Sequence, residues 1–199
     1  MSNYKNFIQD FPGRCGEILK SHSEQMKADG LEVTQLLSLA SVAITIPFER
    51  LRKPTDGVKH PSNDRSIYPK ANSTFANLCG KSFIGSRLWP EVDDAWKKGV
   101  VNQNQVSGEV EAWVSNCRIL SPNCKVRDLL VHIRNSIAHG NIYTKAENKN
   151  HIIELIFLNS IDKSGENFHF LFVTVENFKA FLINWIEFLK CINLERTNN

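Results

Sequence analysis

An arginine and a histidine stand close together in residues 134–140, RNSIAHG. Arginine can bind a phosphate through two parallel hydrogen bonds, and histidine exchanges protons near neutral pH. Asn135 has an amide that can hydrogen-bond a phosphate oxygen or orient its neighbours. Arg134, Asn135 and His139 are therefore candidate catalytic residues for cleaving a phosphodiester such as RNA. Arg134 would stabilise charge on the phosphate, and His139 would act as general base or acid.

The apolar spacing predicts that residues 125–139 form an amphipathic helix, which Gly140 ends in a left-handed conformation. The stripe at i, i+3 and i+4 consists of Val126, Leu129, Leu130, Ile133 and Ile137. On an ideal helix, Arg134 and His139 diverge by roughly 140°. A shared site would therefore need the chain turn at Gly140, a matching helix from a second subunit, or both.

A structural interpretation of the same residues is simpler, and spacing alone favours it. A histidine in the last helical turn is stabilised by the helix dipole. An arginine beside an apolar stripe can lie over it with its charged head in water. Short motifs match by chance often enough that the spacing does not establish a catalytic site.

The remaining pattern predicts a mostly α fold with a small β-hairpin inserted before the C-terminal helix. Apolar periodicity predicts helices over residues 7–28, 32–52 and about 175–192, the last capped by Thr174. Two strands, 151–158 and 168–173, flank a loop and would pair as the hairpin. In the middle of the chain, the residue pattern predicts a polar loop over residues 53–72 and helices near 74–79, 90–98 and 109–120.

Composition is that of a soluble globular domain, with 42% hydrophobic and 23% charged residues. A formal net charge of +3 permits an acidic partner such as RNA without requiring one. Five widely spaced cysteines without a C-x-x-C pair favour reduced thiols over a disulfide framework or zinc site. The N-terminus has no apolar signal core and no run is long enough to span a bilayer, so we expect a cytoplasmic protein.

No motif indicates a metal or a cofactor. The other histidines, His22, His60, His132, His151 and His169, do not show metal-ligand spacing. Gly80-Lys81-Ser82 lacks the glycine-rich lead of a phosphate loop, and no G-x-S-x-G nucleophile elbow occurs. We read the tryptophans at 113 and 185 as core or interface residues, and base stacking as a minor option for those at 89 and 96.

Basic side chains flank the arginine–histidine segment, and Lys145 is the candidate RNA contact among them. The others are Lys125, Arg127 and Lys149. The alternative is a solvated rim, because Asp128 and Glu147 dilute the positive charge.

The run R-N-S-I-A-H-G resembles the signature of HEPN domains (higher eukaryote and prokaryote nucleotide-binding), which is an arginine, a polar residue and a histidine four to six positions on. Phe11-Pro12, the segment LLSLASVAITIPFER and the hairpin-then-helix order are similar to a bacterial, plasmid-associated HEPN subfamily. The resemblance covers most of the chain as a single domain, residues 1–199. A loop-rich insertion, about residues 53–108, matches poorly.

The resemblance implies a HEPN-like helical bundle that forms a homodimer, with Arg134, Asn135 and His139 facing the cleft between subunits. It implies a metal-independent endoribonuclease without cofactors, often a toxin or defence effector. An antitoxin protein is a further implied partner, although Asn141 replaces a tyrosine that some toxin members carry. The alternative function is a non-catalytic HEPN dimer that binds RNA or protein.

Overall fold

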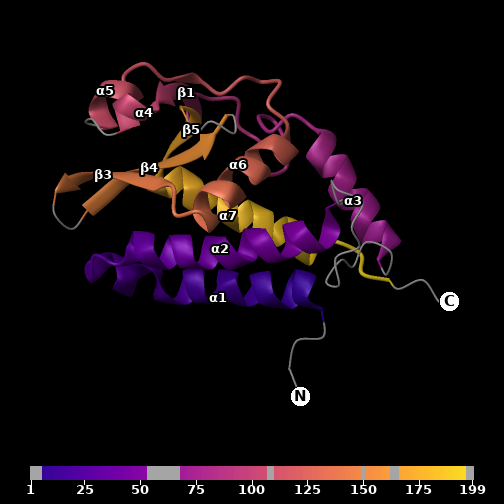
Figure 1. Cartoon of the computed structure of the whole chain (residues 1–199). Helices are drawn as coiled ribbons and strands as arrows, with labels where there is room; N and C mark the ends of the chain where they lie inside the picture. The colour runs from indigo at the N-terminus through magenta and orange to yellow at the C-terminus, as the bar shows by residue number, and fades with distance from the viewer. Residues whose placement is uncertain (1–5, 53–67, 107–109, 149–150, 162–165, 196–199) are drawn as a thin grey trace.

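The computed structural model describes residues 6–52, 68–106, 110–148, 151–161 and 166–195. Three long helices form one layer: α1 (Phe7–Ala28), α2 (Glu32–Leu51) and α7 (Val175–Lys190). α1 and α2 run side by side along the bottom of Figure 1, joined by a tight turn in which Gly30 has a φ of 69°. α7 packs against both of them, and its Trp185 donates a buried hydrogen bond of 2.8 Å to the Ala43 carbonyl oxygen.

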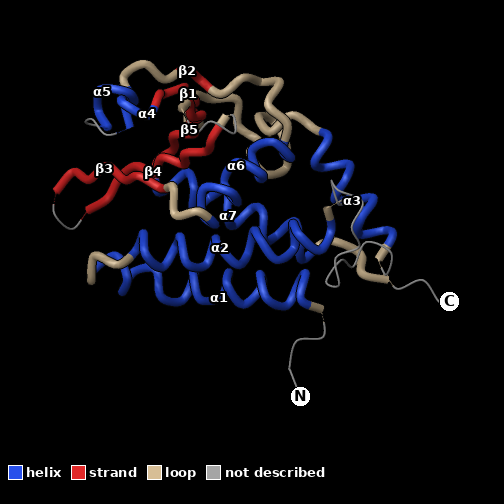
Figure 2. Tube along the Cα trace, viewed as in Figure 1, coloured by secondary structure: helices blue, strands red, loops and turns tan. Residues whose placement is uncertain are grey.

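A five-stranded antiparallel sheet forms the second layer (Figure 2). Its strands are β1 (Lys97–Asn102), β2 (Arg118–Ile119), β3 (Ile142–Asn148), β4 (His151–Ser160) and β5 (Asn167–Thr174). They are ordered β2-β1-β5-β4-β3, so β1 pairs with β5 although the two are distant in sequence.

Alternation along β4 and β5 sends apolar side chains to both faces of the sheet. Leu155, Phe157, Leu171 and Val173 join the main core with α7 and α6 (Val126–Ala138). Ile156, Leu158, Phe170 and Phe172 form a second cluster on the opposite face. That cluster packs against apolar residues of two short helices, α4 (Gln103–Val106) and α5 (Val110–Val114).

The prediction of a mostly α bundle with one small hairpin is wrong. The hairpin β4–β5 is present, but β1, β2 and β3 extend it to five strands. β1 and β3 consist mainly of exposed and half-buried positions, with Val101 of β1 buried in the second cluster, and each pairs with an apolar strand. Gly99 in β1 lies against the Phe170 ring, where an added Cβ would approach a ring carbon to 2.3 Å.

The long helices agree with the predictions to within one or two residues. Thr174 caps α7, accepting a 3.2 Å hydrogen bond from the Asn177 backbone. Pro47 lies inside α2, which continues to Leu51. The expected helix over 109–120 is only α5 followed by β2, and residues 90–98 are not helical.

The middle of the chain contributes one helix that matters for the site, α3 (Pro69–Gly80), which packs against α2 and α6. It begins inside the predicted 53–72 loop, of which residues 53–67 lie outside the described residues. Trp89 and Trp96 are buried against Phe83 and Phe181, so they belong to the core and are not available to stack on bases. Trp185 is also a core residue, whereas the Trp113 side chain lies outside the described part.

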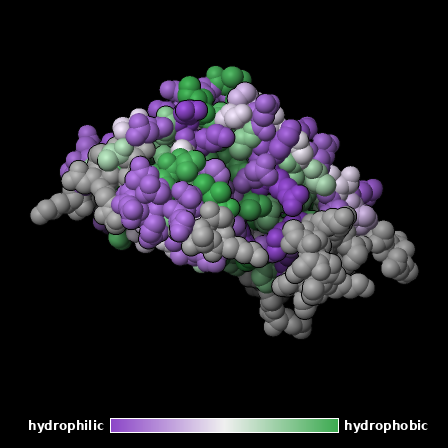
Figure 3. Space-filling view, turned by 45° about the horizontal axis from the view of Figure 1, so that its top comes forward, coloured by the Kyte–Doolittle hydropathy of each residue, from purple (hydrophilic) through white to green (hydrophobic). Residues whose placement is uncertain are grey.

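Figure 3 turns the top of Figure 1 toward the viewer, and hydrophobic side chains form separate areas among hydrophilic ones on this face. Among the described helices, none combines the length and hydropathy that a membrane-spanning segment needs.

Candidate functional site

The C-terminal end of α6 fixes the backbone around His139. α6 ends at Ala138, His139 is its C-cap residue with φ −99° and ψ 1°, and Gly140 follows with a φ of 68°. Gly140 N–H donates to the Ile137 carbonyl at 3.2 Å, and Asn141 N–H donates to the Ser136 carbonyl at 2.8 Å. This pair of bonds is a Schellman motif, in which a glycine takes the left-handed position. The predicted turn at Gly140 is confirmed.

Two polar side chains attach α6 to strand β4. Ser136 is fully buried, and its Oγ lies 2.9 Å from both the Leu158 and His132 carbonyl oxygens. His132 Nε2 lies 2.8 Å from the Phe157 carbonyl oxygen. A carbonyl only accepts, so Nε2 carries the proton. Burial lowers the pKa of His132, which is consistent with a neutral imidazole held as a structural donor. His132 thus points to β4.

Arg134 is held at both ends of its guanidinium group. Nη2 lies 2.8 Å from Glu49 Oε1 on α2, and Nη1 donates a 2.8 Å hydrogen bond to Asn135 Oδ1. Glu49 also forms an ion pair with Arg52, whose Nε lies 2.7 Å from Oε2. The result is a chain of alternating charge, Arg52–Glu49–Arg134, with the Arg134 side chain 28% exposed.

The structure brings Arg134 and Asn135 together but does not join His139 to them. His139 is exposed at the helix end, and within the described ranges its side chain is in no hydrogen bond or ion pair. Arg134 faces α2, and the helical angle of roughly 140° separates the two directions. One chain therefore supplies an anchored arginine and an exposed histidine on different sides of the same helix end.

The flanking cations are divided between two places. Lys145 lies on β3 with its Nζ 3.4 Å from Glu154 Oε2. Lys125 and Arg127 lie at the start of α6, beside a cavity. Lys149 lies outside the described residues. In the part of the chain that the structure describes, His, Cys, Asp and Glu side chains form no cluster of three that could hold a metal.

Glu49 and Arg52 are site residues that the sequence analysis missed. No spacing rule connects them to Arg134, because the contact depends on how α2 and α6 pack. Ser136 had a signal, since it falls three residues after Ile133, on the apolar face of the helix. A polar residue on a buried face usually has a hydrogen-bond partner, and here that partner is the β4 backbone.

A protein-family model described as HEPN pEK499 p136 matches residues 1–195. The chain belongs to this HEPN family. The match includes residues 53–108, where the motifs alone gave the poorest resemblance. No curated protein and no solved structure matches the chain. HEPN membership supports a nucleotide-binding, ribonuclease-like domain, and within that domain the arginine–histidine segment forms the C-terminal end of α6.

Proposed function

We propose that this HEPN domain is a metal-independent endoribonuclease that works as a homodimer. The observation that carries the proposal is the end of α6, where an anchored Arg134 and an exposed His139 follow each other within six residues. Asn135 holds one guanidinium nitrogen of Arg134, which orients the group and reduces its rotamer freedom.

The reaction would be an attack of the RNA 2′-oxygen on the adjacent phosphorus. A base takes the 2′-hydroxyl proton while the O2′–P bond forms, and the P–O5′ bond breaks as the 5′-oxygen takes a proton from an acid. Arg134 neutralises the charge that develops on the phosphate oxygens. The products are a 2′,3′-cyclic phosphate and a 5′-hydroxyl.

The divergence of Arg134 and His139 favours a site shared by two subunits. A two-fold axis beside α6 would place His139 of the partner subunit near Arg134, and the reverse. Each composite site would then have one histidine, from the chain that does not supply its arginine, to act as base or acid. Lys145 is the proposed contact for the strand outside this cleft, after exchange of its Glu154 partner for phosphate.

The first test compares wild type with Arg134→Ala and His139→Ala on single-stranded RNA in EDTA. We expect cleavage by wild type to leave cyclic-phosphate ends, and each variant to lose at least about 100-fold in rate, as for loss of an acid–base group or an oxyanion donor. Equal rates in the three proteins would remove both residues from the mechanism.

Mixing the two inactive variants tests the shared site. In a heterodimer, one composite site regains Arg134 from one chain and His139 from the other. Random exchange of subunits should therefore restore about a quarter of the wild-type rate. No recovery, with subunit exchange verified by a tagged chain, would place the two residues in one subunit or require all four.

The cellular role we propose is that of a toxin or defence effector acting on cytoplasmic RNA, restrained by an antitoxin protein. Induction of the wild-type chain should arrest growth, whereas His139→Ala should not. Equal growth in both strains at equal protein levels would contradict this role.

The second candidate function is a non-catalytic dimer that binds RNA or protein. The position of Glu49 favours this second function, because its carboxylate is already paired with the Arg134 guanidinium group that would otherwise bind a phosphate. This function predicts RNA binding that weakens with salt and is unaffected by His139→Ala, without cleavage products.

A further inference from the structure

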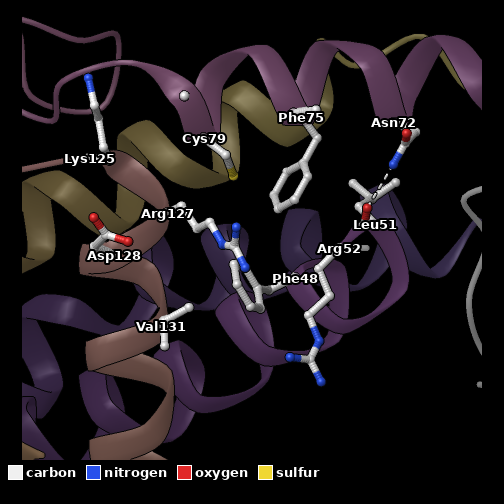
Figure 4. A pocket seen from close by; sticks show the side chains of 12 residues that line it. Phe48, Leu51, Arg52, Asn72, Phe75, Cys79, Lys125, Arg127, Asp128 and Val131 are labelled. Atoms are coloured by element: carbon white, nitrogen blue, oxygen red, sulfur yellow. Dashed lines mark hydrogen bonds between the residues drawn. The ribbon is translucent and has the colours of Figure 1, made fainter. Parts of the chain in front are cut away.

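A cavity of about 490 Å³ lies between the C-terminal end of α2, helix α3 and the first turns of α6 (Figure 4). Its wall is apolar where Phe48, Leu51, Phe75 and Val131 line it. Burial raises the pKa of the Cys79 thiol in this wall to about 12, so the thiol stays neutral. The volume falls within the range of roughly 300–1,000 Å³ that is usual for small-ligand sites.

The rim of the cavity is cationic. Arg52, Lys125 and Arg127 line it, against a single carboxylate from Asp128. In Figure 4 the Arg127 guanidinium is directed toward the centre of the cavity, between Cys79 and Phe48, whereas Lys125 and Arg52 lie toward opposite ends. Within the described residues, the Arg127 and Lys125 side chains are in no hydrogen bond or ion pair, so both charges are available to an anion.

The cavity and the Arg134 site follow each other along α6. Arg127, Val131 and Arg134 follow at i, i+4 and i+7, which places them on one face of the helix. The rise from Arg127 to Arg134 is about 10 Å, so the two guanidinium groups reach different parts of one extended ligand. On α2, Arg52 is connected to Arg134 through the shared carboxylate of Glu49.

We propose that this cavity holds one nucleotide of the RNA strand, next to the nucleotide whose phosphate binds Arg134. The base lies against the apolar wall, and its phosphate contacts Arg127 and Lys125. Asp128 offers an acceptor to an exocyclic amino group, which adenine, cytosine and guanine carry and uracil lacks. The proposal rests on the proposed function for the identity of the strand, and it adds a specificity site outside the reacting groups.

The experiment measures binding of 2′-O-methyl oligonucleotides, which lack the attacking hydroxyl and cannot be cleaved. A single abasic position is moved along the strand. We expect one position, or two adjacent ones, at which loss of the base weakens binding at least about fivefold, the lower end of the range for one base on an apolar or aromatic surface.

Two variants test whether the loss of affinity at the abasic position arises in the cavity. Arg127→Gln removes the central charge, and Ala76→Trp fills the space from the exposed side of α3. Each should weaken binding of the intact strand and abolish the abasic penalty. Arg118→Gln is the matched control, because it removes an exposed arginine on β2 away from the cavity. Thermal unfolding checks that each variant folds.

The outcomes separate this proposal from the ribonuclease assignment. Absence of strand binding, an equal penalty at every abasic position, or equal losses in Arg127→Gln and Arg118→Gln would overturn the nucleotide site, even if the enzyme cleaves RNA. A localised penalty that Arg127→Gln removes would support the site, even if wild type shows no cleavage.

Discussion

Glu49 gives Arg134 both a fixed position and a competing charge. The ion pair holds the guanidinium group in one orientation, which reduces the entropy lost on binding a phosphate. The same carboxylate partly neutralises Arg134 and Arg52, because it lies within 2.8 Å of each. Glu49 should therefore improve the positioning of Arg134 while it weakens the affinity of Arg134 for a phosphate.

Replacing Glu49 by Gln should separate those two effects. The amide keeps the size of the side chain but removes its charge, so the affinity for a 2′-O-methyl strand should rise about two- to fivefold at low salt. The salt dependence should steepen because more uncompensated cations meet the phosphates. Cleavage per bound strand should fall, since Arg134 loses its anchor. Fluorescence anisotropy and single-turnover cleavage measure the two quantities.

Glu32→Gln serves as the matched control for that experiment. Glu32 is a carboxylate in the first turn of the same helix, and it pairs with Lys179 instead of Arg134. Its replacement should leave RNA affinity unchanged. Equal gains in affinity for both variants would show that the effect comes from net charge alone.

The identities of Arg134, Asn135 and His139 as candidates could be predicted from residue types and spacing. The partner of Arg134 could not, because Glu49 comes from another helix and periodicity describes one helix at a time. The chain has 21 acidic residues, and by residue type alone any of them could pair with an arginine. Only the packing of α2 against α6 brings Glu49 to Arg134.

At the scale of elements, the end of α6 depends on the backbone of Gly140. Gly140→Ala should lower the free energy of unfolding by about 1–2 kcal/mol, the cost of a left-handed conformation for an L-residue. The cost is conformational, because an added Cβ would meet nothing within 4 Å. Urea denaturation measures the change.

Gly80→Ala is the control for the effect of an added methyl group. Gly80 ends α3, also has open space around its Cβ position, and does not have a positive φ. Alanine is the better helix former, so this variant should be neutral or more stable by up to about 1 kcal/mol. Destabilisation of both variants by the same amount would contradict the role assigned to the turn.

The junction of α6 with β4 should make stability depend on pH through His132. The folded-state pKa of His132 lies below its unfolded value of about 6.5, because burial disfavours the charged imidazole. Near pH 6 the unfolded chain therefore binds more protons than the folded one. Stability is fully present above about pH 6.5 and declines as the pH falls toward the folded pKa.

Denaturation of wild type and His132→Gln at pH 7.5 and 5.5 checks this dependence. Glutamine can still donate to the Phe157 carbonyl but does not titrate, so the loss of stability at pH 5.5 should be smaller in the variant. The pKa of His169 is also lowered, by burial and then by Lys98, so a double replacement should flatten the profile further. An identical pH slope in wild type and His132→Gln would contradict the argument.

Some helices and strands can be predicted from sequence and others cannot. The difference is whether an element carries its own apolar pattern or depends on pairing with a neighbour. α1, α2, α6 and α7 carry their own apolar stripe, so local periodicity identifies them. β4 and β5 are apolar on both faces and rich in β-branched and aromatic residues, which identifies them as strands. β1, β2 and β3 carry no such signal, because their pairing with neighbours, and not their own residues, determines them.

At the scale of the whole molecule, Gly99 and Phe170 join distant parts of the chain. Gly99→Ala should destabilise the protein by more than Gly140→Ala, since its Cβ would overlap a buried ring on the adjacent strand. Overpacking of this kind costs about 1–3 kcal/mol, occasionally more. Denaturation with urea measures the loss.

A second substitution tests whether the ring is the cause. Phe170→Leu should destabilise wild type by leaving space in the second cluster but should cost less in the Gly99→Ala background. Additive losses would show that the alanine acts through the backbone of β1 and not through the ring.

The strand order also determines when, during synthesis of the chain, the sheet can form. β1 ends at Asn102 and cannot pair with β5 until Asn167 has been made, about 65 residues and roughly 3–13 s later at ordinary rates of about 5–20 residues per second. The helix that carries Arg134 and His139 can pack on α2 and α3 as soon as it is made, but its hydrogen bonds to the Phe157 and Leu158 carbonyls must wait for β4. A nascent chain would therefore carry both residues before the β4 side of α6 is in place, so the complete helix end forms only after β4 has been made.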